Sequence, residues 1–220
     1  MMKELLEEYF GRHYHSTKVV SAECQTLQGR FVFADPRACE SCRNTMSDDG
    51  AECDKAVFIC DSEEKMVEAI NLERFLDSFH HLKAIPSGKK CDLLLVGTEK
   101  IVFCDMTCSK AKYIEPYEMS DGTKKTGKRN AVKEQISNSV SLLSDVPEIK
   151  AEIANKSEKI ALFAYRDKAE NQYYAFDAKV RANLSVFHTI ETALFQEPMF
   201  SDIGNGFLFT EIKYNHIYIW

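Results

Sequence analysis

Apolar runs and polar stretches alternate along the chain in a pattern that predicts both strands and helices. Residues 1–14 carry apolar side chains at helical spacing, which indicates a short first helix. Two β-like runs lie within residues 18–33, and a polar stretch follows over 35–54. The compact apolar run KAVFIC, at 55–60, is typical of a buried strand.

The residues after this strand predict a helix over 61–79. Asp61 can act as its N-cap and Glu64 lies three residues further on, which is the capping-box arrangement. Beyond this helix, two apolar runs at 91–96 and 101–107 are separated by a short polar sequence that contains a glycine. This pattern indicates a β-hairpin.

The second half of the chain predicts a similar mixture of elements. The polar segment 113–128 is too long for a simple connection, so we interpret it as a functional loop. One-sided apolar spacing predicts a helix over 130–143, and KIALFAYR at 159–166 predicts another buried strand. With two late strands, GFLFTEI and HIYIW, these elements predict a single α/β domain over 1–220 with a central mixed sheet flanked by helices.

Composition narrows the class of protein. With 220 residues, of which 45% are apolar and 28% charged, the chain can bury a hydrophobic core, and its nine Gly and five Pro exclude collagen-like classes. No apolar run approaches the ~20 residues of a membrane-spanning helix, so we expect no membrane partner. The acidic, amphipathic start MMKELLEEYF lacks the charge layout of a signal peptide. We therefore expect a cytoplasmic protein whose eight cysteines are reduced.

The charge is unevenly distributed. A formal net charge of −6 argues against a protein that coats nucleic acid through bulk positive charge. However, residues 110–133 contain seven basic residues against three acidic ones, a balance of +4 that leaves −10 for the remainder. A segment of this kind can grip a phosphate backbone, or it can be an ordinary solvated loop. The candidate nucleic-acid-binding residues are Lys112, Lys124, Lys125, Lys128 and Arg129.

Two aspartates lie on the predicted hairpin. Asp92 opens the first strand, and Asp105 lies near the end of the second. Because side chains alternate along a strand, Asp105 and Thr107 share one face, opposite to Cys104. If the two strands are neighbours, the aspartates can converge on one Mg²⁺, which prefers oxygen ligands. The competing interpretation is that both are strand-end residues of an ordinary hairpin.

The order of helix, hairpin, loop, helix and strand resembles the PD-(D/E)xK nuclease-like superfamily of restriction, repair and defence nucleases. The residues that carry the resemblance are Glu68 and Glu73 on the first helix, Asp92 and Asp105 on the hairpin, and Lys133 and Gln135 in VKEQISNSV. The resemblance implies a restriction-endonuclease-like core over about 61–166. An N-terminal β/Cys-containing extension, 1–60, and a C-terminal α+β extension, 167–220, would complete the chain.

The resemblance also implies a metal-dependent phosphodiesterase that acts on nucleic acid, in a setting such as prokaryotic antiviral defence. Mg²⁺ or Mn²⁺ would be held by Asp92 and Asp105, with Glu68 or Glu73 completing the site. The implied catalytic residues are the two aspartates, a lysine that steadies the attacking water, and Gln135.

One departure from the family pattern concerns that lysine. The family expects it two positions after the second acid, where this chain has Thr107. A lysine from another position can replace it, and the candidates are Lys110, Lys112 and Lys133. The alternative function, which Thr107 favours, is a catalytically degenerate nuclease-fold subunit that binds nucleic acid or a partner protein subunit.

The early cysteines offer a competing site. Cys39 and Cys42 have the C-x2-C spacing of a zinc knuckle, and Cys53 and Cys60 follow after ten and six residues. Zn²⁺ bound by these four would staple the polar stretch 35–54. The second alternative function is therefore a zinc-stapled interaction module. Against zinc, a buried free cysteine can pack simply as a small hydrophobic side chain.

Overall fold

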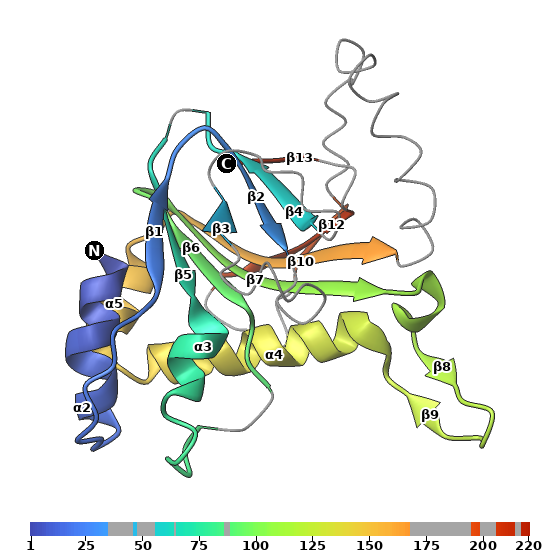
Figure 1. Cartoon of the computed structure of the whole chain (residues 1–220), viewed down its shortest axis with the longest axis horizontal. Coiled ribbons are helices and arrows are strands. Elements are labelled where there is room, and N and C mark those ends of the chain that lie inside the picture. Colours follow the sequence, from blue (N-terminus) through green and yellow to red (C-terminus); the bar gives the residue numbers. More distant parts are fainter. Residues whose placement is uncertain are drawn as a thin grey trace.

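The computed structural model describes residues 1–34, 46–47, 56–63, 65–85, 89–167, 195–198, 206–213 and 217–220. A large mixed sheet lies between a layer of helices and a smaller sheet (Figure 1). The predicted α/β class, with a central mixed sheet flanked by helices, is confirmed.

The large sheet has seven strands and changes from antiparallel to parallel at its centre. In spatial order they are β1 (Cys24–Leu27), β5 (Val67–Asn71), β6 (Leu93–Val96), β7 (Lys100–Ser109), β10 (Glu158–Asp167), β12 (Leu208–Lys213) and β11 (Phe195–Pro198). Strands β1, β5, β6 and β7 are successively antiparallel. Strand β10 is parallel to both β7 and β12, and β11 is antiparallel to β12.

The helical layer covers one face of this sheet. It contains α1 (Met2–Leu5), the π-helical turn η1 (Leu6–Phe10), α2 (Gly11–His13), α3 (Leu72–Asp77), α4 (Gly127–Ser144) and α5 (Pro147–Ala154). Helix α4 runs along β7 and β10 (Figure 1). No helix in the described part of the chain is long and apolar enough to cross a membrane.

The small sheet covers the other face. Its strands, in spatial order, are β13 (Ile217–Ile219), β4 (Ala56–Asp61), β2 (Arg30–Ala34) and β3 (Met46–Ser47). Strand β4 is antiparallel to β2 and parallel to β13. The large sheet is therefore buried on both faces, which explains why its central strands are almost continuously apolar in sequence.

Strand β7 shows how the two hydrophobic cores are separated. Ile101 and Phe103 belong to the core under the helices, whereas Val102 and Cys104 belong to the core between the two sheets. This is the two-residue alternation of an extended strand. The predicted hairpin, the late strands, the strand at 159–166 and the helix at 130–143 are all confirmed, although the helix begins earlier, at Gly127.

The predicted helix over 61–79 is wrong, because most of it is strand and turn. Residues 67–71 form β5, every residue of which is buried between β1 and β6. Only Leu72–Asp77 is helical, and its N-cap is Asn71, whose Oδ1 accepts from the amide of Arg74 at 3.2 Å. Asp61 instead closes a tight turn by accepting from the amide of Glu63 at 3.0 Å. The pairing of β5 with β1 and β6 has therefore outweighed the local helix-start signal at Asp61.

Candidate acidic site on the central sheet

Asp92, the residue immediately before β6, lies beside Asp105 of the neighbouring strand β7. Leu93 pairs with Cys104 in the antiparallel β6–β7 ladder, so the register continued by one residue sets Asp92 against Asp105. Directly opposed residues on one face have Cβ atoms about 4.5–5.5 Å apart. Both side chains are buried, with exposed fractions of 7% and 5%. The hairpin thus brings together the two acids that the sequence singled out.

Asp92 is held in place by both its side chain and its backbone. Its Oδ2 atom accepts from the amide of Met106 at 2.6 Å, which draws the carboxylate toward β7. Its backbone carbonyl accepts from the amide of Leu72 at 2.9 Å and from that of Glu73 at 3.3 Å. The start of α3 and strands β6 and β7 therefore meet at this residue.

Asp105 points toward the helical layer. Its neighbours Cys104 and Met106 belong to the core between the sheets, so Asp105 and Thr107 take the opposite face, as the alternation predicted. Across the sheet, Asp105 is level with Phe163 of β10, and Phe163 is level with Glu211 of β12. A row of residues that includes two acids thus crosses β7, β10 and β12 on the face that α4 covers.

Two buried thiols lie within electrostatic range of the acids. Burial raises the pKa of Cys91 well above its usual value, and the charges of Asp105 and Asp92 raise it further, against a lowering contribution from Ser139. Burial, followed by the charges of Asp92 and Asp105, also raises the pKa of Cys104. Both groups stay as neutral thiols at physiological pH. They therefore pack as apolar groups and do not act as thiolate nucleophiles.

Helix α4 fixes the segment that leads into Asp92. Gln135 Nε2 donates to the carbonyl of Lys90 at 3.1 Å, and the amide of Cys91 donates to Ser139 Oγ at 3.0 Å. Gln135 and Ser139 are four residues apart and so share one side of the helix. Gln135, predicted as catalytic, therefore contacts the backbone two residues before Asp92.

Lys133 lies on another side of the same helix. Its Nζ atom is 4.7 Å from the centroid of the Phe209 ring on β12, a cation–π contact. Because Gln135 contacts the segment before β6 while Lys133 contacts β12, the two side chains approach the sheet on either side of β7. Helix α4 therefore places two cations over β12, because Lys133 contacts Phe209 and Arg129 pairs with Glu211.

Lys110 and Lys112 lie beyond the end of β7. Lys110 is five residues after Asp105, which is about 16 Å along an extended strand. Both side chains are exposed. The structure therefore does not bring either of them to the acid pair.

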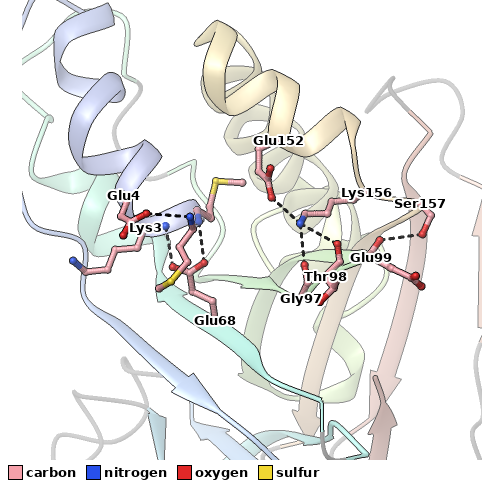
Figure 2. Close-up of polar contacts among 11 residues, drawn as sticks. Lys3, Glu4, Glu68, Gly97, Thr98, Glu99, Glu152, Lys156 and Ser157 are labelled. Carbon is pink, nitrogen blue, oxygen red and sulfur yellow. Dashed lines mark hydrogen bonds and ion pairs between the residues drawn. The ribbon is translucent and has the colours of Figure 1, made fainter.

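Glu68 is also not brought together with the two aspartates. It lies on β5, opposite Val96, whereas Asn71 at the other end of β5 is opposite Leu93, the residue next to Asp92. Its carboxylate accepts from the amides of Met2 at 3.0 Å and Lys3 at 2.9 Å, and so caps the first helix (Figure 2). The acid that α3 places beside Asp92 is Glu73, whose amide contacts the Asp92 carbonyl.

A closed cage of protein ligands is absent from the part of the chain that the structure describes. No three His, Cys, Asp or Glu side chains within it are grouped so that they could hold a metal ion. A site of two carboxylates still suits Mg²⁺, which is usually bound through one or two carboxylates, with water and substrate phosphates as its other ligands. Asp92 and Asp105 supply that oxygen donor set.

The basic residues of 110–133 divide into two groups. The side chains of Lys112, Lys124, Lys125 and Lys128 are exposed, as a phosphate-binding role requires. Arg129 is held by two acids, because its Nη2 atom donates to Glu211 Oε2 at 2.9 Å and its guanidinium also pairs with Glu115. We assign Arg129 a structural role, joining α4 to β12 and to the segment after β7.

The zinc prediction falls largely outside the described residues, since Cys39, Cys42 and Cys53 are not among them. Cys60 is described. It is fully buried on β4, in the core between the two sheets, and burial raises the pKa of its thiol. In the described part of the chain, Cys60 packs as an apolar side chain.

Sequence reasoning missed two residues that position the site. Ser139 lies one helical turn after Gln135, so the i,i+4 spacing on a predicted helix could have identified it. Lys90 is only 1% exposed and pairs with Asp77 at the end of α3. A lysine beside an apolar run carries no sequence signal for such burial.

Comparisons of the chain with known protein families, with curated proteins and with solved structures found no match. The resemblance stated from the sequence therefore stays a prediction, and the geometry of the site carries the functional argument.

Proposed function

We propose that the protein is a metal-dependent phosphodiesterase that acts on nucleic acid, with Asp92 and Asp105 as the protein ligands of one Mg²⁺ or Mn²⁺ ion. The observation that carries the proposal is the register of β6 and β7, which sets these two buried acids against each other. The proposal is also supported by the strand order, in which an antiparallel β5–β6–β7 unit is followed by α4 and by the parallel strand β10. The hairpin β6–β7, helix α4 and strand β10 follow the order that the resemblance implies, although strand β5 stands where the resemblance implied most of a helix.

A divalent cation at this place would polarise a phosphate oxygen and make a bound water more acidic. The residues of the chain supply the geometry. The amide of Met106 orients the Asp92 carboxylate, and Gln135 and Ser139 fix the segment that precedes it. We propose Lys133, which α4 places over Phe209 of β12, as the source of the positive charge that Thr107 lacks and that would stabilise the negative transition state.

The first test replaces each aspartate by its neutral isostere. Asp92→Asn and Asp105→Asn should each reduce cleavage of single-stranded and double-stranded DNA and RNA by about 100-fold or more, because ligand charge is lost while shape is kept. Cleavage is measured with Mg²⁺ and with Mn²⁺, and chelation with EDTA should abolish it. Calorimetric titration with Mn²⁺ gives a readout independent of turnover and should lose binding in both variants.

The matched control is Asp145→Asn, because Asp145 is an exposed aspartate at the far end of α4, away from the acid pair and from the residues that position it. It should keep metal binding and cleavage. Failure of the purified protein to cleave any of these substrates with either metal would contradict the proposal, as would cleavage that survives in Asp105→Asn.

A second candidate function is favoured by Thr107. This residue lies on the same face as Asp105 and is buried, with 7% of its surface exposed, where an active family member has a lysine. We propose as the alternative a nuclease-fold subunit that binds nucleic acid or a partner protein without cleaving it. This alternative predicts metal binding at the acid pair together with no cleavage, and cleavage dependent on Asp105 would exclude it.

A further inference from the structure

The segment from Lys110 to Thr126 connects the end of β7 to the start of α4 and projects from the rest of the fold. It contains the 3-10 turn η2 (Ala111–Tyr113) and the small hairpin β8 (Tyr117–Glu118) and β9 (Lys124–Lys125). We call residues 110–126 the arm. Figure 1 shows it projecting beyond the end of the large sheet, away from the helices α1 and α5.

The base of the arm is firmly closed. The amide of Arg129 donates to the carbonyl of Ile114 at 3.1 Å, and the Arg129 guanidinium pairs with Glu115. Gly127 has a φ of +79°, and a Cβ atom added there would lie 2.4 Å from the carbonyl carbon of Glu115. The arm is therefore a built element with a fixed origin and not a simple connection.

Two tyrosines on the arm form an aromatic pair. The ring centroids of Tyr113 and Tyr117 are 4.7 Å apart, with an angle of 55° between the ring planes. Lys112 Nζ lies 4.9 Å from the centroid of the Tyr113 ring, and Tyr117 is opposite Lys125 in the β8–β9 ladder. Both rings are half-buried, so part of each ring is open to solvent. Aromatic surface and positive charge are thus interleaved at one place.

Two acids of the arm have polar partners, because Glu115 pairs with Arg129 of α4 and Asp121 accepts from the amide of Thr123 at 2.9 Å. The third acid, Glu118, is opposite Lys124 in the β8–β9 ladder. The lysine side chains of the arm are exposed. An anionic partner that approaches the arm therefore meets ammonium groups beside aromatic rings.

We infer that the arm binds single-stranded nucleic acid, with unpaired bases stacking on the Tyr113–Tyr117 pair and the backbone phosphates contacting Lys112, Lys124 and Lys125. The inference rests on the proposed function and adds the class of substrate. Bases in a duplex are already stacked on each other and cannot cover a protein ring, whereas an unpaired base can. A duplex would meet only the lysines, against a remainder of the chain that is strongly acidic.

The test measures the binding of fluorescein-labelled oligothymidylate of about 20 nucleotides, which exceeds the ~4–16 nucleotides that one single-strand-binding fold covers. The full chain is used with EDTA present, so that cleavage does not interfere, and anisotropy is compared with that of a duplex of equal length. We expect the single strand to bind about tenfold tighter than the duplex. Tyr113→Ala with Tyr117→Ala should weaken single-strand binding by about tenfold or more.

Two further double variants distinguish base stacking on the tyrosine rings from a general effect of the side-chain volume at these positions. Tyr113→Phe with Tyr117→Phe keeps both rings and should retain wild-type affinity. Tyr113→Leu with Tyr117→Leu keeps apolar bulk without an aromatic face and should lose affinity as the alanine pair does. Equal binding of duplex and single strand, or full binding by the leucine pair, would overturn the inference.

The charge contribution has its own matched control. Lys124→Glu with Lys125→Glu should weaken binding strongly and reduce its salt dependence. Lys83→Glu with Lys150→Glu makes the same charge change at exposed positions outside the arm and should have a much smaller effect. Equal effects of the two pairs would show that only net charge matters and would contradict a site on the arm.

The outcome for the arm is distinguishable from that for the acid pair. Asp92→Asn and Asp105→Asn should bind oligothymidylate normally. Absence of cleavage with intact single-strand binding would contradict the proposed function and leave the arm assignment standing. Cleavage that persists while the tyrosine variants bind normally would contradict the arm assignment alone.

Discussion

At the scale of single residues, Glu68 shows how a buried acid can serve the fold instead of chemistry. Its carboxylate accepts two backbone amides from Met2 and Lys3, and Cys24 Sγ lies 3.7 Å from one of its oxygens. The partners lie 66 and 65 residues away in sequence. A negative side chain at the start of a helix satisfies amides that have no partner within the helix and complements the helix dipole.

The role of Glu68 can be tested by Glu68→Gln. Loss of the charged acceptor should lower the free energy of unfolding by about 1–2 kcal/mol, measured by urea denaturation. Cleavage per folded molecule should be unchanged, because Glu68 lies away from the acid pair. Glu4→Gln is the control at an exposed acid of the same helix and should change stability by less than ~0.5 kcal/mol. Loss of Mn²⁺ binding in Glu68→Gln would show that Glu68 is a ligand after all.

At the scale of elements, the arm depends on a close backbone approach at the start of α4. Gly127 combines a φ of +79° with a Cβ direction blocked by the backbone of Glu115. Gly122, at the tip of the arm, has a φ of +81°, but a Cβ atom there would meet no atom within 4 Å. Alanine at Gly122 would therefore introduce backbone strain alone, whereas alanine at Gly127 would introduce both strain and steric overlap.

We expect Gly122→Ala to lower the free energy of unfolding by only about 1 kcal/mol, since strain is its sole cost. Gly127→Ala carries the overlap as well and should lower it by about 2–4 kcal/mol. Chemical denaturation measures both. Equal losses in the two variants would mean that the backbone at Gly127 moves away freely and that the base of the arm is loosely held.

Elements with strong local signals were predictable from sequence, and those decided by distant contacts were not. The hairpin and α4 have clear periodicity, and because the hairpin is local, the opposition of Asp92 and Asp105 followed from it. Strand β5 is buried on both faces and so has no alternation, while Asp61 followed by Glu64 imitates a helix start. The prediction of a helix there hid the contacts of Glu68 with the amides of Met2 and Lys3, because no spacing in the sequence indicates them.

At the scale of the whole molecule, the two sheets are joined by the segment that contains Trp220. The amide of Trp220 donates to the carbonyl of Asp61 at 2.9 Å, and its ring lies against Gly97 in the turn between β6 and β7. A Cβ atom at Gly97 would be 2.9 Å from the Trp220 ring. The same turn is held from the helical side by Lys156, whose Nζ atom donates to the carbonyls of Gly97 and Thr98 (Figure 2).

A double-mutant cycle tests this junction. Trp220→Ala should lower the free energy of unfolding by about 3 kcal/mol or more, because it leaves a cavity in the core between the sheets. Gly97→Ala should be destabilising in the wild type and nearly neutral in the Trp220→Ala background, where the overlapping ring is gone. Additive losses would show that the two residues are not coupled and that Trp220 packs elsewhere.

The pairing of β13 with β4 has a consequence for how the chain folds. Ile217 pairs with Ile59, so this ladder joins residues that are far apart in sequence and is disfavoured early by the entropy of closing so long a loop. On the ribosome, β4 and β2 emerge long before β13, and until then one edge of β4 presents unpaired backbone groups. Until β13 joins, that edge of β4 lacks its partner strand, and an unpaired strand edge can pair with another chain.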